Sequence, residues 1–259
     1  MSSNKELHSH VLTKALFLVV AELYQYPSPP WIKRVMNRCV IIGKQKEPSI
    51  FVTVKEDLAI KGSVSMEEEA ALGDFIGIDI GTTSIKCCVL DIRKKIRSEK
   101  SVVHNAWVKN GSNLHREQDP VKILNVLQNL LKSMEVKLSS KVAVSITGQM
   151  HGIVLWNGQD LAKGEFNCSP LITWMDERVP VKFLESLPRW DCGDLHIGYG
   201  MVTLAWLYSS GQFNSAWTCC GTIMDMIISY LLQSSQAFIG IQNAYSWGYC
   251  SFSGQWTVT

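Results

Sequence analysis

The sequence predicts an α/β fold in which a mixed sheet is flanked by helices, and three observations lead to this prediction. Two short apolar runs, residues 75–80 and 85–90, flank a four-residue polar turn, which is typical of buried strands joined as a hairpin. From Pro120 onward, apolar residues recur at the three- and four-residue steps of a helix. A further apolar run and three later helical segments then follow, as in α/β folds.

The composition is that of a globular chain with enough length for one or two domains. Its 259 residues are 46% hydrophobic and 19% charged, which excludes the disordered and collagen-like classes. The formal net charge of +2 gives no strong attraction for nucleic acid or a membrane, so we expect a small-molecule partner.

The longest early apolar run, residues 15–21, is too short to span a membrane and fits either a short buried helix or a signal-peptide core. Eight cysteines without a CxxC motif predict reduced thiols and a cytoplasmic protein.

The first 73 residues differ in character from the rest. Prolines within residues 27–30 interrupt any helix, and a charged segment at residues 67–71 resembles a solvated linker. We therefore place a boundary near Gly73. It separates an irregular, partly disordered extension of unknown role, residues 1–73, from a folded domain over residues 74–259.

The remaining elements of the domain can be placed in order along the chain. A third strand is expected over residues 101–107. Asp119 and Pro120 predict the N-cap and first position of a helix that runs to about Leu138. The elements expected after this helix are a strand over residues 141–147 and helices over residues 181–187, 202–209 and 222–233.

The turn between the first two strands has the chemistry of a phosphate site. Its glycine lets the backbone approach a ligand, and its N–H groups and hydroxyls can surround phosphate oxygens. Asp79 at the strand end suits Mg²⁺, and Lys86 can neutralise phosphate charge. The candidate phosphate residues of the turn are Gly81, Thr82, Thr83 and Ser84. A plain hairpin with a Gly-Thr turn explains the segment equally well at this point, and no GxxxxGKS or GxxxxGKT motif is present.

This segment resembles the first phosphate motif of the actin-like ATPase superfamily, in which sugar kinases, heat-shock chaperones and actin share a Gly-x-Asp-x-Gly-Thr-Thr hairpin. The resemblance implies a ribonuclease H-like lobe with a mixed sheet flanked by helices. It does not by itself choose among the members of the superfamily.

A second segment, residues 144–152, is a buried strand that runs into a polar loop between two glycines. Gln149 and His151 can hydrogen-bond sugar hydroxyls, although a lone histidine is more often structural. The segment is similar to the substrate loop of the FGGY carbohydrate kinases. That resemblance also assigns Met150 to the sugar site.

A third segment carries Trp174, Asp176 and Arg178 and is similar to the Trp-x-Asp-x-Arg element of the same family. A tryptophan offers an apolar face to the C–H surface of a sugar, and the resemblance places all three residues at the substrate. An Asp–Arg pair can equally lock a loop through charge-assisted hydrogen bonds, so a structural role fits Asp176 and Arg178 as well.

Two further segments, residues 116–119 and 221–249, resemble the sedoheptulokinase branch of the family more closely than its glycerol or xylulose kinases. The resemblance covers residues 75 to about 258. Within it, Ile241 stands where the branch usually has Asp, and Tyr245 stands where a small residue is usual. A bulky side chain in a packed loop typically costs about 1–3 kcal/mol, so we expect Tyr245 to disturb local order.

The resemblance implies a kinase that uses ATP and Mg²⁺ to phosphorylate a primary hydroxyl of a ketose, converting sedoheptulose to sedoheptulose 7-phosphate in the pentose phosphate pathway. Asp79 would hold Mg²⁺, and Lys86 and the turn residues would contact the ATP phosphates. The family's catalytic Asp and its glycine-rich adenosine site belong to a second lobe, for which these 259 residues offer no counterpart. We therefore expect a truncated kinase without a catalytic base of its own.

Two alternatives stay open. The chain could be a non-catalytic pseudokinase fragment that binds sugar, or that associates with a protein partner through the face that the second lobe would cover. It could also be a chaperone-like ATPase of the same superfamily. The segments around His151 and Trp174 argue against the chaperone.

Overall fold

The computed structural model describes residues 40–42 and 52–54, residues 74–134 except 92, 94 and 110, and residues 143–256. The expected extension over residues 1–73 therefore lies outside the described residues, apart from two short strands. The chain divides into two compact units: residues 1–103 with 126–147, and residues 104–125 with 148–259. No helix within the described ranges is both long and apolar enough to cross a membrane.

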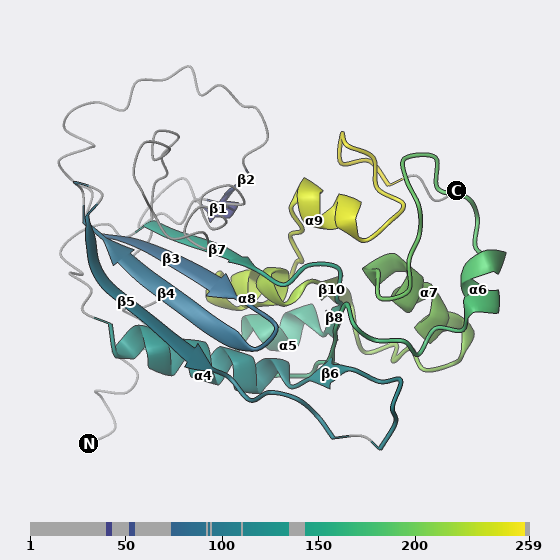
Figure 1. The fold of residues 1–259 in the computed structure, drawn as a ribbon, viewed down its shortest axis with the longest axis horizontal. Coiled ribbons are helices and arrows are strands. Elements are labelled where there is room, and N and C mark those ends of the chain that lie inside the picture. The colour runs from purple at the N-terminus through teal and green to yellow at the C-terminus, as the bar shows by residue number, and fades with distance from the viewer. Residues whose placement is uncertain are drawn as a thin grey trace. The chain divides into compact units, whose positions relative to one another are not determined.

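The first unit is built on a six-stranded sheet with the order β2-β1-β7-β3-β4-β5. The strands β3, β4 and β5 form an antiparallel meander, whereas β3 and β7 point in the same direction, so the sheet is mixed as predicted (Figure 1). The strand bounds are β1 Val40–Ile42, β2 Val52–Val54, β3 Phe75–Ile80, β4 Ser84–Leu90, β5 Ile96–Val103 and β7 Ala143–Gly148.

The hairpin of β3 and β4 was predicted from its apolar residues, and these residues are the ones that the sheet buries. Ile78, Ile80 and Ile85 are almost completely buried. The third strand is confirmed, but the expected bounds of residues 101–107 were wrong because β5 begins at Ile96 and ends at Val103. The strand β5 lies at the edge of the sheet with mostly exposed side chains, so its first half carries charges instead of an apolar pattern.

The helix α4, Pro120–Lys132, begins as the sequence predicts. The Asp119 side chain accepts hydrogen bonds from the backbone N–H groups of Val121 (2.9 Å) and Lys122 (3.0 Å), as an N-cap does. The helix was expected to continue to about Leu138, but Ser133 is already outside it. The Ser133 hydroxyl donates to the carbonyl of Leu130 (2.7 Å), which satisfies a carbonyl of the last turn. Residues 135–138 lie outside the described part of the chain.

The second unit combines small sheets with short helices. Strands β8 and β10 form one antiparallel pair, and β6 and β9 form another. The helices predicted near residues 181, 202 and 222 are confirmed as α6, α7 and α8. The bounds in this unit are β6 Glu117–Gln118, β8 Val154–Trp156, α5 Gly158–Ala162, β9 Leu171–Ile172, α6 Val181–Ser186, α7 Gly200–Ser209, β10 Cys219–Gly221, α8 Ile223–Leu231 and α9 Ile241–Ser246.

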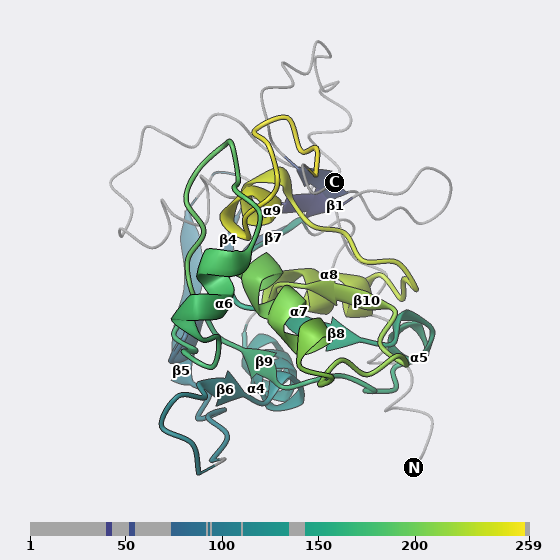
Figure 2. The ribbon, with the colours of Figure 1, turned by 90° about the vertical axis from the view of Figure 1, so that its right-hand side faces the viewer.

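The core of the second unit forms where α7 packs against β8 (Figure 2). Leu155 of β8, Leu207 of α7 and Trp247 after α9 belong to one buried cluster. The close approach of α7 depends on Gly200, because a Cβ there would lie 2.3 Å from the Trp247 ring. The backbone N–H of Met201 also donates to the carbonyl of Trp247 (3.2 Å), which joins α7 to the segment after α9.

Candidate functional site

The phosphate turn of the first unit joins β3 to β4. The backbone N–H of Gly81 donates to the carbonyl of Ser84 (3.0 Å), which closes the turn, and a Cβ on Gly81 would lie only 3.1 Å from that oxygen. The strand register pairs Asp79 with Lys86, and their charged ends are 3.7 Å apart. The side chains of both residues reach solvent, and Thr83 is exposed.

The residues of this turn fit the Mg²⁺ ion and the phosphate groups that the sequence predicts for them. One carboxylate at a strand end beside a solvated turn suits Mg²⁺, which usually keeps several waters and takes only one or two protein carboxylates. The ammonium group of Lys86 and the hydroxyls of Thr82, Thr83 and Ser84 supply hydrogen-bond donors for phosphate oxygens. Among the described residues, no group of three or more His, Cys, Asp and Glu side chains is placed to hold a metal ion.

Three segments of the second unit converge around the predicted sugar residues. Ile153 and Ile172 form an antiparallel bridge, and a Cβ on Gly152 would lie 3.2 Å from the Cα of Thr173, so the segment that carries His151 runs beside the segment that carries Trp174. Thr173 in turn donates from its backbone N–H (3.0 Å) and its hydroxyl (2.8 Å) to the carbonyl of Arg116. The fold thus brings together two motifs that are more than twenty residues apart in the sequence.

His151 is held in a specific and unusual conformation. Its backbone φ is 67°, in the left-handed region that side chains other than glycine seldom adopt. Its Nδ1 lies 2.6 Å from the carbonyl oxygen of Ser246. Because a carbonyl oxygen only accepts, Nδ1 carries a proton, and in the uncharged form of the ring Nε2 is then an acceptor.

The Tyr199 ring stacks on the His151 ring, with centroids 4.8 Å apart and planes 4° apart. The sequence offered no signal for Tyr199 or for the carbonyl of Ser246. Burial raises the pKa of the Tyr199 phenol, with smaller contributions from Tyr245 and Asp194. The phenol therefore stays neutral beside the imidazole.

The Gln149 side chain is buried, with 9% of its surface exposed. Its Nε2 donates to the Oε1 of Gln118 (3.0 Å), and its own Oε1 has no hydrogen-bond partner within the described ranges. Gln118 belongs to the matched segment 116–119 but was not singled out from sequence. Met150 is half-buried between Gln149 and His151.

The Arg178 guanidinium joins two carboxylates. It binds Asp176 through two hydrogen bonds (2.7 and 2.8 Å) and Glu117 through a third (2.6 Å). Burial acts to lower the pKa of Arg178, but the hydrogen bonds and charges of Asp176 and Glu117 outweigh it and raise that pKa. Asp176 also accepts from the backbone N–H of Arg116 (2.7 Å), so the network fixes the loops on either side of the predicted sugar residues. This is the loop-locking role that the sequence left open.

Trp174 is the most exposed of the predicted sugar residues, with 47% of its surface accessible. Its carbonyl lies against Gly198, whose φ is +88° and where a Cβ would be 2.2 Å from that oxygen. Only glycine fits this approach, which brings the segment before Tyr199 beside Trp174. The backbone of Trp174 therefore lies beside the segment that leads to Tyr199, whose ring stacks on that of His151.

Asp225, in the fourth matched segment, is fully buried at the start of α8. Its Oδ2 accepts from the backbone N–H (2.7 Å) and the hydroxyl (2.6 Å) of Thr222, which completes a capping box. Burial raises the pKa of Asp225 to about 7, while hydrogen bonds from Thr222 and the side chain of Asn243 act to lower it.

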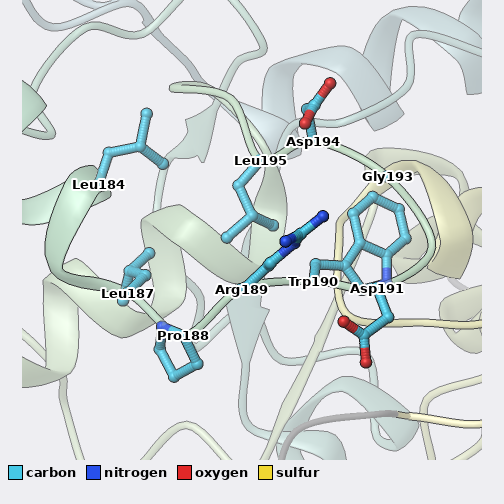
Figure 3. A pocket seen from close by; sticks show the side chains of 9 residues that line it. All are labelled: Leu184, Leu187, Pro188, Arg189, Trp190, Asp191, Gly193, Asp194 and Leu195. Atoms are coloured by element: carbon cyan, nitrogen blue, oxygen red, sulfur yellow. The ribbon is translucent and has the colours of Figure 1, made fainter.

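A surface cavity of about 350 Å³ lies in the loop after α6. Figure 3 shows the side chains that line it, which include Arg189, Trp190 and Asp194 but none of the residues predicted from sequence. The Tyr245 hydroxyl donates to the carbonyl of Cys192 in this loop (2.8 Å), and its ring lies 5.1 Å from that of Trp190. The expectation that Tyr245 disturbs local order was wrong, because its ring and hydroxyl both have partners that anchor the loop.

Comparison with known proteins identifies a family. Residues 75–188 match the model of the FGGY family of carbohydrate kinases, N-terminal domain. The chain is 31% identical over 211 residues to sedoheptulokinase from Homo sapiens, covering 71% of this chain and 43% of that protein. It is also 31% identical over 201 residues to sedoheptulokinase from Mus musculus, covering 70% of this chain and 42% of that protein. The chain thus spans less than half the length of these relatives.

Two solved structures show the same fold at low sequence identity. Xylulose kinase from Rhodospirillum rubrum superposes with a TM-score of 0.57 at 16% identity, covering 70% of this chain and 38% of that one. Plasmodium falciparum glycerol kinase with ADP superposes with a TM-score of 0.56 at 19% identity, covering 71% of this chain and 39% of that one. The predicted actin-like ATPase fold is therefore confirmed.

Proposed function

The chain belongs to the FGGY family of carbohydrate kinases, whose N-terminal domain matches its residues 75–188, and from this premise we propose that it supplies the phosphate and sugar residues of an ATP-dependent sedoheptulokinase. The reaction is transfer of the γ-phosphoryl group of ATP to a primary hydroxyl of a ketose, giving sedoheptulose 7-phosphate. The 31% identity to two sedoheptulokinases supports sedoheptulose as the sugar.

The arrangement at His151 carries the proposal. In its uncharged form, the His151 ring with Nδ1–H bonded to the carbonyl of Ser246 would offer Nε2 as an acceptor for a sugar hydroxyl. The half-exposed Trp174 belongs to the segment that runs beside that of His151 and would offer an apolar face to the sugar ring. A site that uses such directed hydrogen bonds discriminates strongly against ligands that lack the hydroxyl.

The turn of the first unit supplies the phosphate side of the proposal. When bound, ATP provides the phosphoryl group and Mg²⁺ neutralises its charge. Asp79 would hold the Mg²⁺, and Lys86 with the donors of residues 81–84 would orient the phosphates. Phosphoryl transfer depends mainly on such positioning and charge neutralisation. None of these side chains is assigned as the base toward the sugar hydroxyl, because the family resemblance puts that aspartate on another lobe.

Calorimetric titration of the 259-residue chain with sedoheptulose tests the proposal. We expect a saturable heat that is lost in His151→Leu and kept in Tyr208→Phe, a matched change on an exposed ring of the same unit. An absence of saturable heat in the unmodified chain would count against a sugar site.

An ADP-release assay separates the kinase from the non-catalytic alternative. With ATP, Mg²⁺ and sedoheptulose, we expect this polypeptide to release no ADP above background unless a polypeptide carrying the second lobe is added. Turnover by the polypeptide alone would mean that one of its own residues acts as the base. Sugar binding without turnover in either mixture would favour a sugar-binding pseudokinase.

A further inference from the structure

We propose that Tyr199 is a positioning residue that fixes the plane and tautomer of His151, so that Nε2 is aimed at a sugar hydroxyl. The proposal rests on the proposed function, because the hydroxyl belongs to the sugar. It assigns to Tyr199 an action through His151 and no contact with the reacting atoms.

One hydrogen bond alone does not fix an imidazole. The bond from Nδ1 to the carbonyl of Ser246 holds one ring atom but leaves the ring free to tilt about that direction. The Tyr199 ring removes this freedom, because it covers the imidazole face at 4.8 Å with planes only 4° apart. The two contacts together determine both the ring plane and the nitrogen that carries the proton.

Tyr199 is itself held in place from several sides. It is the N-cap residue of α7, and its backbone N–H donates to the carbonyl of His196 (3.1 Å). The ring of His196 meets the Tyr199 ring edge-on at 5.2 Å. On either side of Tyr199 is a glycine that tolerates no side chain, since a Cβ on Gly198 or Gly200 would lie 2.2 Å or 2.3 Å from a neighbouring atom.

The carbonyl of Ser246 is fixed equally well. It belongs to the last residue of α9, whose following residue, Trp247, is part of the buried core. The His151 ring therefore bridges the start of α7 and the end of α9. This geometry compensates for the left-handed backbone of His151, which would otherwise be unfavourable.

The chemical consequence is selectivity for a hydroxyl group. In the uncharged ring, with Nδ1–H bonded to a carbonyl, Nε2 can accept a hydrogen bond but cannot donate one. A sugar hydroxyl donates to it readily, whereas a carbonyl or ether oxygen at the same place cannot. A ring that was free to change tautomer would lose this discrimination.

Nitrogen NMR of the histidine-labelled full chain tests the proposal without any sugar. The two ring nitrogens of His151 should show the shifts of a single Nδ1–H tautomer in the unmodified chain and in Tyr199→Phe. In Tyr199→Ala we expect averaged shifts, which report a mixture of tautomers. A merely structural role for Tyr199 would leave the tautomer unchanged in every variant that folds.

Sedoheptulose affinity of the same variants completes the test. Because an aromatic stacking contact is worth about 0.5–1.5 kcal/mol, Tyr199→Ala should bind about two- to twelvefold more weakly while Tyr199→Phe binds as the unmodified chain does. Equal losses in both variants would show that the hydroxyl contacts sugar directly and would overturn the proposal. Averaged shifts in Tyr199→Ala, with no sugar binding by the unmodified chain, would support the positioning role and refute the proposed function.

Discussion

The buried carboxyl group of Asp225 should make the stability of the second unit depend on pH. Its pKa is about 7 in the folded chain, against an ordinary value of 3.8. Between these values the folded chain holds a proton that the unfolded chain has released, so the free energy of unfolding falls as the pH rises. The shift is about 3 pH units, and each unit corresponds to about 1.4 kcal/mol, so the full effect is about 4 kcal/mol.

The substitution Asp225→Asn isolates this effect. The amide does not titrate, and its oxygen can still accept both hydrogen bonds from Thr222. Urea unfolding followed by tryptophan fluorescence reports on the second unit, which contains Trp156, Trp190 and Trp247. The stability of the unmodified chain relative to Asp225→Asn should fall by about 3 kcal/mol from pH 5 to pH 8.

The matched control is Glu185→Gln, which removes an exposed carboxylate from α6 in the same unit. Its stability should follow that of the unmodified chain at every pH. If the free energy of unfolding depended on pH in the same way in the unmodified chain and in Asp225→Asn, the prediction would be refuted. Such a result would show that Asp225 ionises equally in the folded and unfolded states.

Three further predictions concern packing and can be checked by the same urea unfolding at pH 7. Gly200→Ala should lose about 3 kcal/mol because its Cβ would lie 2.3 Å from the Trp247 ring, and no loss would mean that α7 can move away. Tyr245→Ala should lose about 2–4 kcal/mol and Tyr245→Phe about 1 kcal/mol, whereas a gain for the alanine variant would restore the view that a small residue fits better. Arg178→Lys should lose about 3 kcal/mol because lysine cannot bind Asp176 through two parallel bonds, and an unchanged midpoint would contradict the network.

The parts of the fold that sequence predicted are those in which a local pattern coincides with burial. The hairpin of β3 and β4, the N-cap at Asp119 and the helix α8 each carry their own signal. The strand β5 does not, because an edge strand needs no apolar face. Its predicted end at residue 107 also failed because Asn105 has a φ of 48°, which no extended strand accommodates.

The residues of the candidate site could be predicted only where one short segment contains the functional side chains. Residues 149–151 and Trp174 are found from their motifs, and the bridge of Ile153 with Ile172 explains why their segments lie side by side. The partners that orient them come from distant segments or from the main chain. The carbonyl of Ser246 has no side-chain signature, and the stacking of Tyr199 depends on two glycines whose role appears only when their neighbours are known.

The central claim is that His151 faces a sugar, and its Nε2 nitrogen reports on this directly. Titration of the histidine-labelled chain with sedoheptulose should shift the Nε2 resonance of His151 in a saturable way, because a new hydrogen bond forms at that atom, while Nδ1 stays bonded to Ser246. The resonances of His196, whose ring contacts Tyr199 but which was not placed at the sugar, serve as the internal reference. An Nε2 resonance that does not move at saturating sedoheptulose would contradict the account.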